Sequence, residues 1–106
     1  MAEEKSYDKL IRDRIPELIE SSGKECTVRE LEGDEYSQKL KKKLLEEVKE
    51  YLESGNFEEI VDIFEVLRYL VEAHDRSIEE LEQLRQQKKE KRGGFEKGLL
   101  LQEVRG

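Results

Sequence analysis

Cysteine, histidine and long apolar runs are scarce in this sequence, and each scarcity excludes a class of protein. With one cysteine, Cys26, and one histidine, His74, the chain can form no intrachain disulfide and no zinc site built from several Cys and His ligands. No apolar run approaches the ~20 residues of a membrane-spanning helix, and the start, MAEEKS, lacks the apolar region of a signal peptide. We therefore expect a cytoplasmic protein with no membrane partner, in which any metal site uses oxygen ligands.

The charge balance is acidic. Charged residues make up 44% of the sequence, and the formal net charge is -7. Because phosphate backbones attract basic proteins, we expect no nucleic-acid polymer as a partner. Only 35% of the 106 residues are hydrophobic, which predicts a single domain over 1–106 with a small core.

The spacing of apolar residues predicts two long helices in the middle of the chain. The first is expected over 35–53, with Asp34 as its N-cap, and the second over 57–73. The residues between them, Ser54-Gly55-Asn56, have turn chemistry. So short a connection predicts an antiparallel helix hairpin.

Segments outside this hairpin complete the expected all-α fold. Pro16 suits the first turn of a short helix that stops near Gly23, and Ser77 begins a capping-box pattern that predicts a last helix. Residues 24–32 and 99–104 predict extended segments that pair as a short peripheral two-stranded β element. The expected architecture is thus an antiparallel helix bundle with a small β addition.

The second long helix is apolar around most of its circumference, with only a narrow polar arc. A single thin layer of helices would leave part of that surface in contact with water. We therefore expect a homodimer or a larger helical assembly.

Carboxylates recur in the hairpin as Glu46-Glu47-x-x-Glu50 and Glu59-x-x-Asp62. With about 100° of rotation per residue, Glu59 and Asp62 project inside the apolar face of the second helix. Glu47 borders the apolar stripe of the first helix with Glu50 beside it, whereas Glu46 projects to nearly the opposite side. A buried carboxylate normally becomes neutral, pairs with a cation or coordinates a metal, so the inward acids require an explanation.

Inward acids on two adjacent helices would form an oxygen cage of the kind that holds Mg²⁺, with Mn²⁺ as a substitute ion. Such an ion, with a spare carboxylate as base, suits the hydrolysis of a phosphoanhydride. The candidate catalytic and metal-binding residues are Glu47, Glu50, Glu59 and Asp62, with Glu46 as an additional candidate ligand. Basic residues outside the acidic helices are candidates for binding substrate phosphates: Lys9, Arg12, Lys88, Lys91 and Arg92.

Two other interpretations fit parts of the pattern. A di-iron carboxylate bundle usually needs Glu-x-x-His pairs on inward faces, and His74 follows Val71 at that spacing, so we expect this histidine at a helix end or in a loop. A non-catalytic helical oligomer or regulatory interaction protein would use the same acids in salt bridges with lysines and arginines.

The paired acidic motifs, together with YDKLIRDRIPELIE at 7–20 and KRGGFEKGLLL at 91–101, resemble the MazG-like all-α nucleoside triphosphate pyrophosphatase superfamily. The flanks resemble a branch of small, predicted house-cleaning pyrophosphatases. The superfamily includes MazG, dimeric dUTPases and phosphoribosyl-ATP pyrophosphohydrolase. The gap between the acidic motifs is short compared with the dUTPase branch, which disfavours a dedicated dUTPase.

This resemblance implies Mg²⁺-dependent cleavage between the α- and β-phosphates of a nucleotide, giving a nucleoside monophosphate and pyrophosphate. The expected substrates are noncanonical nucleotides, and the phosphoribosyl-ATP pyrophosphohydrolase of histidine biosynthesis is the alternative within the superfamily. The resemblance also implies a homodimer or homotetramer in which neighbouring chains complete the substrate pocket, and metal-binding roles for Glu47, Glu50, Glu59 and Asp62.

Overall fold

The structure, a computed structural model, describes residues 7–106 and confirms the all-α class. Within this range it contains no strand. The expectation about a signal peptide rests on MAEEKS, which lies outside the described residues. None of the described helices combines the length and the apolar character needed to cross a membrane. The helices of the described residues are α1 (Ile15–Ser21), α2 (Gly33–Ser54), α3 (Phe57–Ala73) and α4 (Ile78–Arg92).

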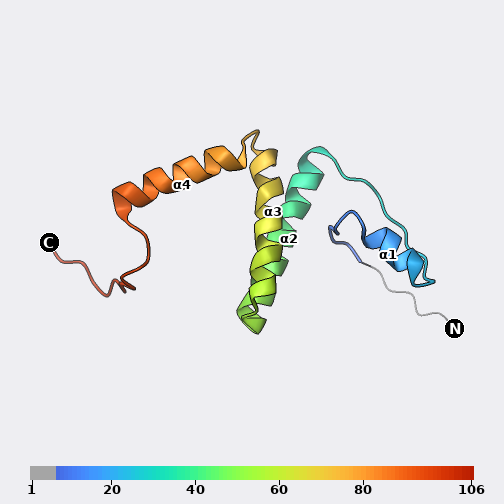
Figure 1. Ribbon diagram of the computed structural model, residues 1–106, viewed down its shortest axis with the longest axis horizontal. Coiled ribbons are helices and arrows are strands. Elements are labelled where there is room, and N and C mark those ends of the chain that lie inside the picture. Colours follow the sequence, from blue (N-terminus) through green and yellow to red (C-terminus); the bar gives the residue numbers. More distant parts are fainter. Residues whose placement is uncertain (1–6) are drawn as a thin grey trace.

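The predicted helix hairpin is confirmed in α2 and α3, which lie side by side as the central column of the molecule (Figure 1). Gly55 adopts a left-handed conformation with φ 67°, which glycine reaches at little steric cost. Its N–H donates a hydrogen bond of 2.7 Å to the carbonyl of Tyr51 and so closes the last turn of α2. The two-residue connection then reverses the chain direction.

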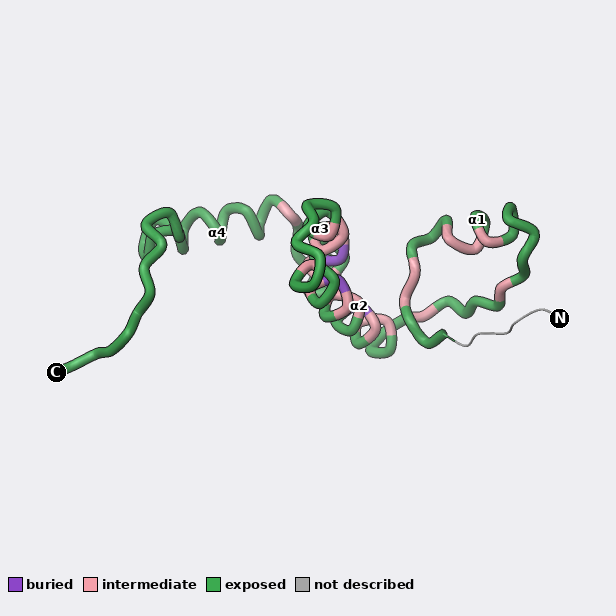
Figure 2. The backbone as a smooth tube through the Cα atoms, turned by 90° about the horizontal axis from the view of Figure 1, so that it is seen from below, coloured by how far each residue is buried: buried purple, intermediate pink, exposed green. Residues whose placement is uncertain are grey.

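The core of the described chain is confined to this hairpin. Leu40 and Val66 are its buried hydrophobic residues, at 3% and 8% exposure. Figure 2 shows the buried positions only on α2 and α3, whereas α4 and the tail beyond it are exposed almost throughout. The small core predicted from composition is therefore formed by one helix pair.

The other helices diverge from the hairpin in opposite directions (Figure 1). The extents of the chain are 67 × 32 × 24 Å and its radius of gyration is 19.0 Å, against about 13 Å for a compact domain of this length. α4 contacts the end of α3 but not α2. In a single copy of the chain, α4 therefore has no helix to pack against beyond the end of α3, whereas the residues before α1 contact the hairpin through ion pairs.

Two local predictions are wrong in this structure. Residues 24–32 and 99–104 do not form the expected β element, because they lie on opposite sides of the hairpin (Figure 1). Neither segment has a neighbouring strand among the described residues, and strand formation depends on such a neighbour. Asp34 is not the N-cap of α2. Glu32 holds that position, and Asp34 lies in the first helical turn, where a carboxylate interacts favourably with the helix dipole.

The other helix signals are confirmed. Pro16 lies in the first turn of α1. The Ser77 side chain accepts a hydrogen bond of 3.2 Å from the Glu80 N–H at the start of α4. His74 is the C-cap residue of α3, which agrees with its expected place at a helix end.

Candidate metal centre

Three of the predicted acids converge across the hairpin. Glu47 and Glu50 come from α2, three residues apart and therefore neighbours on one helix face, and Glu59 comes from the first turns of α3. Each can offer one carboxylate oxygen, and these three oxygens all lie within 4.8 Å of one another. The short turn at Gly55 brings the two helices together at this point. The hairpin thus builds a cluster of oxygen donors from segments that are separate in sequence.

Glu47 is the buried member of this cluster. Its residue exposure is 6%, and its Oε2 atom is buried with no hydrogen-bond partner in the part of the chain that the structure describes. Burial raises the pKa of Glu47, the nearby Glu50 carboxylate raises it further, and Lys43 lowers it. Because a buried carboxylate with an unpaired oxygen is costly, this side chain is suited to receive a cation. Glu59 is half-buried and Glu50 exposed, so a ligand can reach the cluster from solvent.

Asp62 lies outside this cluster and is instead paired with the N-terminal arm, residues 7–14 before α1. Arg12 Nη2 donates a hydrogen bond of 2.8 Å to Asp62 Oδ1, and Arg12 Nη1 lies 3.6 Å from Glu65 Oε2. The structure therefore brings together three of the four acids that the helical projection grouped. The fourth, Asp62, has an arginine as its partner.

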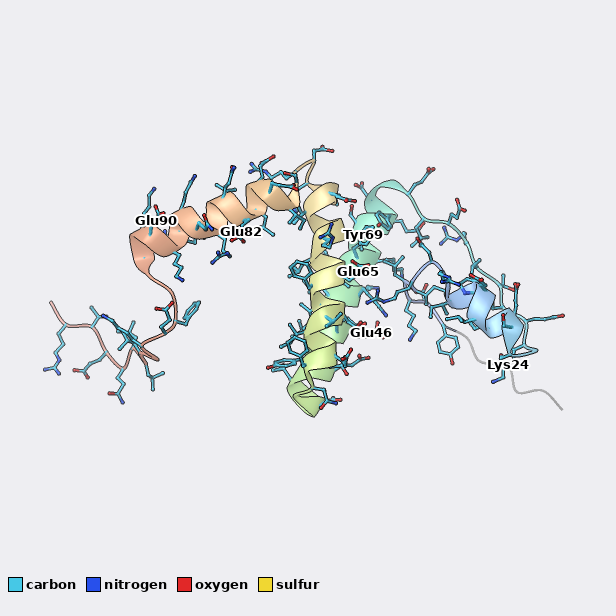
Figure 3. The ribbon with its side chains drawn as sticks, viewed as in Figure 1. Lys24, Glu46, Glu65, Tyr69, Glu82 and Glu90 are labelled. Atoms are coloured by element: carbon cyan, nitrogen blue, oxygen red, sulfur yellow. The ribbon has the colours of Figure 1, made fainter. Side chains whose placement is uncertain are left out.

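Glu46 also has cationic partners. Its carboxylate lies 3.3 Å from Lys43 Nζ and 3.6 Å from Lys9 Nζ, and the residue is half-buried. Figure 3 shows Glu46 and Glu65 on the side of the hairpin that faces α1 and the arm before it. The outward projection of Glu46 thus places it under the arm, where it forms salt bridges.

The candidate phosphate-binding residues divide into two groups. Lys9 and Arg12 contact the acidic helices through the ion pairs described above. Lys88, Lys91 and Arg92 line a shallow pocket at the far end of α4 with Leu84 and Gln87, and α4 has no contact with α2. Within one chain, only the first group lies beside the acids.

Lys43 is the site residue that the sequence analysis missed. Its Nζ lies 3.4 Å from Glu47 Oε1 as well as 3.3 Å from Glu46 Oε2. The signal was available, because residues three and four positions apart on a helix are neighbours. The sequence has three consecutive lysines at 41–43, and the pattern alone does not distinguish the one that contacts the acids.

The donor set fits a hard divalent cation. All three converging groups are carboxylates, and Mg²⁺ is typically held by a small number of carboxylates together with waters and substrate phosphates. The unpaired Oε2 of Glu47 is an acceptor that no group of residues 7–106 satisfies. Glu47, Glu50 and Glu59 are therefore the residues that would hold such an ion.

Comparisons with known proteins give little further information. No family model matches the chain, and no solved structure matches it. An uncharacterized protein of Mycolicibacterium smegmatis is 56% identical to this chain over 41 residues, which are 39% of this chain and 42% of that relative. The match thus covers less than half of either protein, and an uncharacterized relative indicates no activity for this chain.

Proposed function

We propose that this protein is a MazG-like, Mg²⁺-dependent nucleotide pyrophosphohydrolase that cleaves nucleoside triphosphates between the α- and β-phosphates. The observation that carries the proposal is the set of three carboxylate oxygens from Glu47, Glu50 and Glu59 within 4.8 Å of one another. The orphaned oxygen of buried Glu47 and the acidic motifs of the sequence support it. Removal of noncanonical nucleotides from the cytoplasmic pool is the role that we propose for this reaction.

In this proposal the chain's own residues bind and orient the substrate. Bound at these acids, the ion would neutralise phosphate charge and favour ionisation of the attacking water. A carboxylate that is free of the ion accepts the proton of that water, whose oxygen attacks the α-phosphorus while the bond to the bridging oxygen breaks and pyrophosphate leaves. Arg12 is the residue that we propose to hold phosphate oxygens, because it lies beside the acidic helices and a guanidinium can donate two parallel hydrogen bonds to such a group.

The same proposal assigns a second role to the ion pair between Arg12 and Asp62. Both side chains are partly exposed, at 52% and 39%, and exposed pairs of this kind contribute little net stability. Arg12 can therefore exchange Asp62 for a phosphate at small cost. Asp62, once released, is free to add a fourth carboxylate to the site.

We also propose that the working form is a homodimer or homotetramer. The chain exposes 10287 Å², whereas a compact monomer of its size exposes about 6,200 Å². The excess is several times the ~800 Å² per partner that a standard interface buries. The α3 residues Phe57, Ile60, Val61, Phe64 and Leu67 are 37–73% exposed and form the surface proposed to pack against a neighbouring chain. In such an assembly the basic end of α4 could serve the acids of another copy.

The test is release of pyrophosphate in the presence of Mg²⁺ by the wild type and by Glu47→Gln. We expect the substitution to lower the rate at least ~100-fold, the scale on which loss of a catalytic group acts. Glu58→Gln is the matched control, because Glu58 is exposed on α3 next to Glu59 and should leave the rate unchanged. Equal rates in the wild type and Glu47→Gln would overturn the proposal.

A substrate panel separates the alternatives. It should contain ordinary, deaminated and oxidised nucleoside triphosphates and phosphoribosyl-ATP. A preference for phosphoribosyl-ATP would move the protein to histidine biosynthesis. The ion pairs of Glu46 and Asp62 with Lys9 and Arg12 favour a second candidate function, a non-catalytic helical oligomer, for which no substrate of the panel should yield pyrophosphate.

A further inference from the structure

Lys43 connects two acids of the hairpin from within α2. Its Nζ lies 3.3 Å from Glu46 Oε2 and 3.4 Å from Glu47 Oε1. The spacing of three and four residues places the ammonium group directly over both carboxylates. Each acid is therefore in contact with the same positive charge.

The burial of this lysine separates it from its neighbours in sequence. The Lys43 side chain is only 16% exposed, whereas Lys41 and Lys42 are exposed. A lysine is seldom this buried unless it is paired, and its partner Glu47 has a side-chain exposure of 8%. The pair therefore interacts with less screening by solvent than a surface salt bridge.

Within residues 7–106, the members of the acidic cluster differ in how their charge is balanced. Glu47 has Lys43, whereas Glu50 and Glu59 have no ion pair among the described side chains. Lys43 is thus the cation that the fold itself provides next to the cluster. It lies 3.4 Å from Oε1 of Glu47, whereas Oε2 has no hydrogen-bond partner among the described groups.

We propose that Lys43 is an internal countercharge that offsets the repulsion among the clustered acids in the metal-free protein and that weakens their attraction for a divalent cation. This inference rests on the proposed function for the identity of the ion. It makes Lys43 a positioning residue that sets the Mg²⁺ concentration at which the site fills. Neither role requires contact with substrate.

The first arm of the test is a Mg²⁺ titration followed by thermal unfolding, since an ion that binds only the folded state raises its melting temperature. We expect Lys43→Met, which keeps an apolar stem and removes the charge, to lower the half-saturating Mg²⁺ concentration on the order of tenfold. Lys43→Arg, which keeps the charge, should stay close to the wild type. Lys41→Met, which removes an exposed lysine, measures the effect of net charge alone.

The second arm needs no metal. In a chelator, Lys43→Met should lower the melting temperature, and this loss should fall by at least about half in a Glu47→Gln background, because the two groups are coupled directly. Lys43→Gln serves as a second neutral variant should Lys43→Met fail to fold. This double-mutant cycle of Lys43→Met and Glu47→Gln tests the inference without a measurement of catalysis.

The outcomes separate this inference from the proposed function. A wild type that Mg²⁺ does not stabilise would overturn the proposed metal site and the second half of the inference with it. If the wild type is stabilised, then an unchanged or weaker Mg²⁺ midpoint in Lys43→Met, or a shift that Lys41→Met or Lys43→Arg reproduces, overturns the inference alone. An additive cycle with Glu47→Gln overturns the countercharge role in the metal-free state.

Discussion

The α2–α3 hairpin is richer in apolar residues than α4 and its tail, and among the described residues only the hairpin buries any of them. Leu40 and Val66 are buried between α2 and α3, whereas Leu81 and Leu84 on α4 are 44% and 47% exposed. Figure 2 shows this division between the hairpin and the α4 segment. The candidate site lies in the packed region, where helix–helix contact fixes the positions of the acids.

This difference in packing determines whether each region can hold its charged side chains at fixed positions within a single chain. Acids on α2 and α3 are held at fixed separations because two helices pack against each other. The basic residues of α4 have no such support in one chain, since α4 contacts only the end of α3. A preformed site is therefore expected in the hairpin, and an assembly-dependent contribution from α4.

The largest expected effect comes from opening the hairpin core. Leu40 is the most buried of the described hydrophobic residues, at 3% exposure, and Leu40→Ala should lower the free energy of unfolding by about 3 kcal/mol through lost burial and a cavity. Chemical denaturation measures the loss. Leu84→Ala is the matched control on α4, and an equal loss in both variants would show that the two regions do not differ in packing.

The features that the sequence predicts well are those fixed by interactions between residues close together in the sequence. The ends of α3 and the turn at Gly55 follow from local periodicity and from a glycine that can adopt positive φ. The approach of Glu59 to Glu47 follows from the same hairpin. The short connection therefore made much of the acidic cluster predictable.

Contacts between distant segments were not predictable in the same way. The hydrogen bond from Arg12 to Asp62 joins residues 50 positions apart, and it depends on the path of the arm across the hairpin, which no local pattern specifies. The predicted β element failed for a related reason: residues 99–104 have strand-like composition but no partner beside them (Figure 1). Strand propensity mainly reflects packing against such a partner.

A substitution on the exposed face of α3 tests whether assembly completes the packing. Phe64 is 53% exposed, and Phe64→Asp should reduce the molecular mass in solution to that of one chain, because a central aromatic residue can contribute about 2 kcal/mol or more to an interface. Light scattering over a range of concentrations measures the mass. Glu65→Gln, next in sequence and half-buried, should keep the assembled mass.

The same experiment can contradict the proposed assembly. A wild type that has the mass of one chain at every concentration would leave the exposed apolar residues of α3 without the neighbour proposed for them. The difference in burial between the hairpin and α4 would then also exist in the protein in solution. In that case the basic end of α4 would have no route to the acids.

The smallest effect is expected at the start of α4, where local interactions replace tertiary packing. The Ser77 side chain accepts a hydrogen bond of 3.2 Å from the Glu80 N–H, and Ser77→Ala should cost about 1 kcal/mol of local helix stability. Since α4 is joined to the hairpin only through α3, this loss should stay within α4. Hydrogen exchange should therefore be faster at the first amides of α4 and unchanged in α2, with Ser77→Asp as the variant that keeps a cap. Faster exchange across α2 and α3 would mean that α4 and the hairpin unfold as one unit, and that α4 is more closely coupled to the core than its exposure indicates.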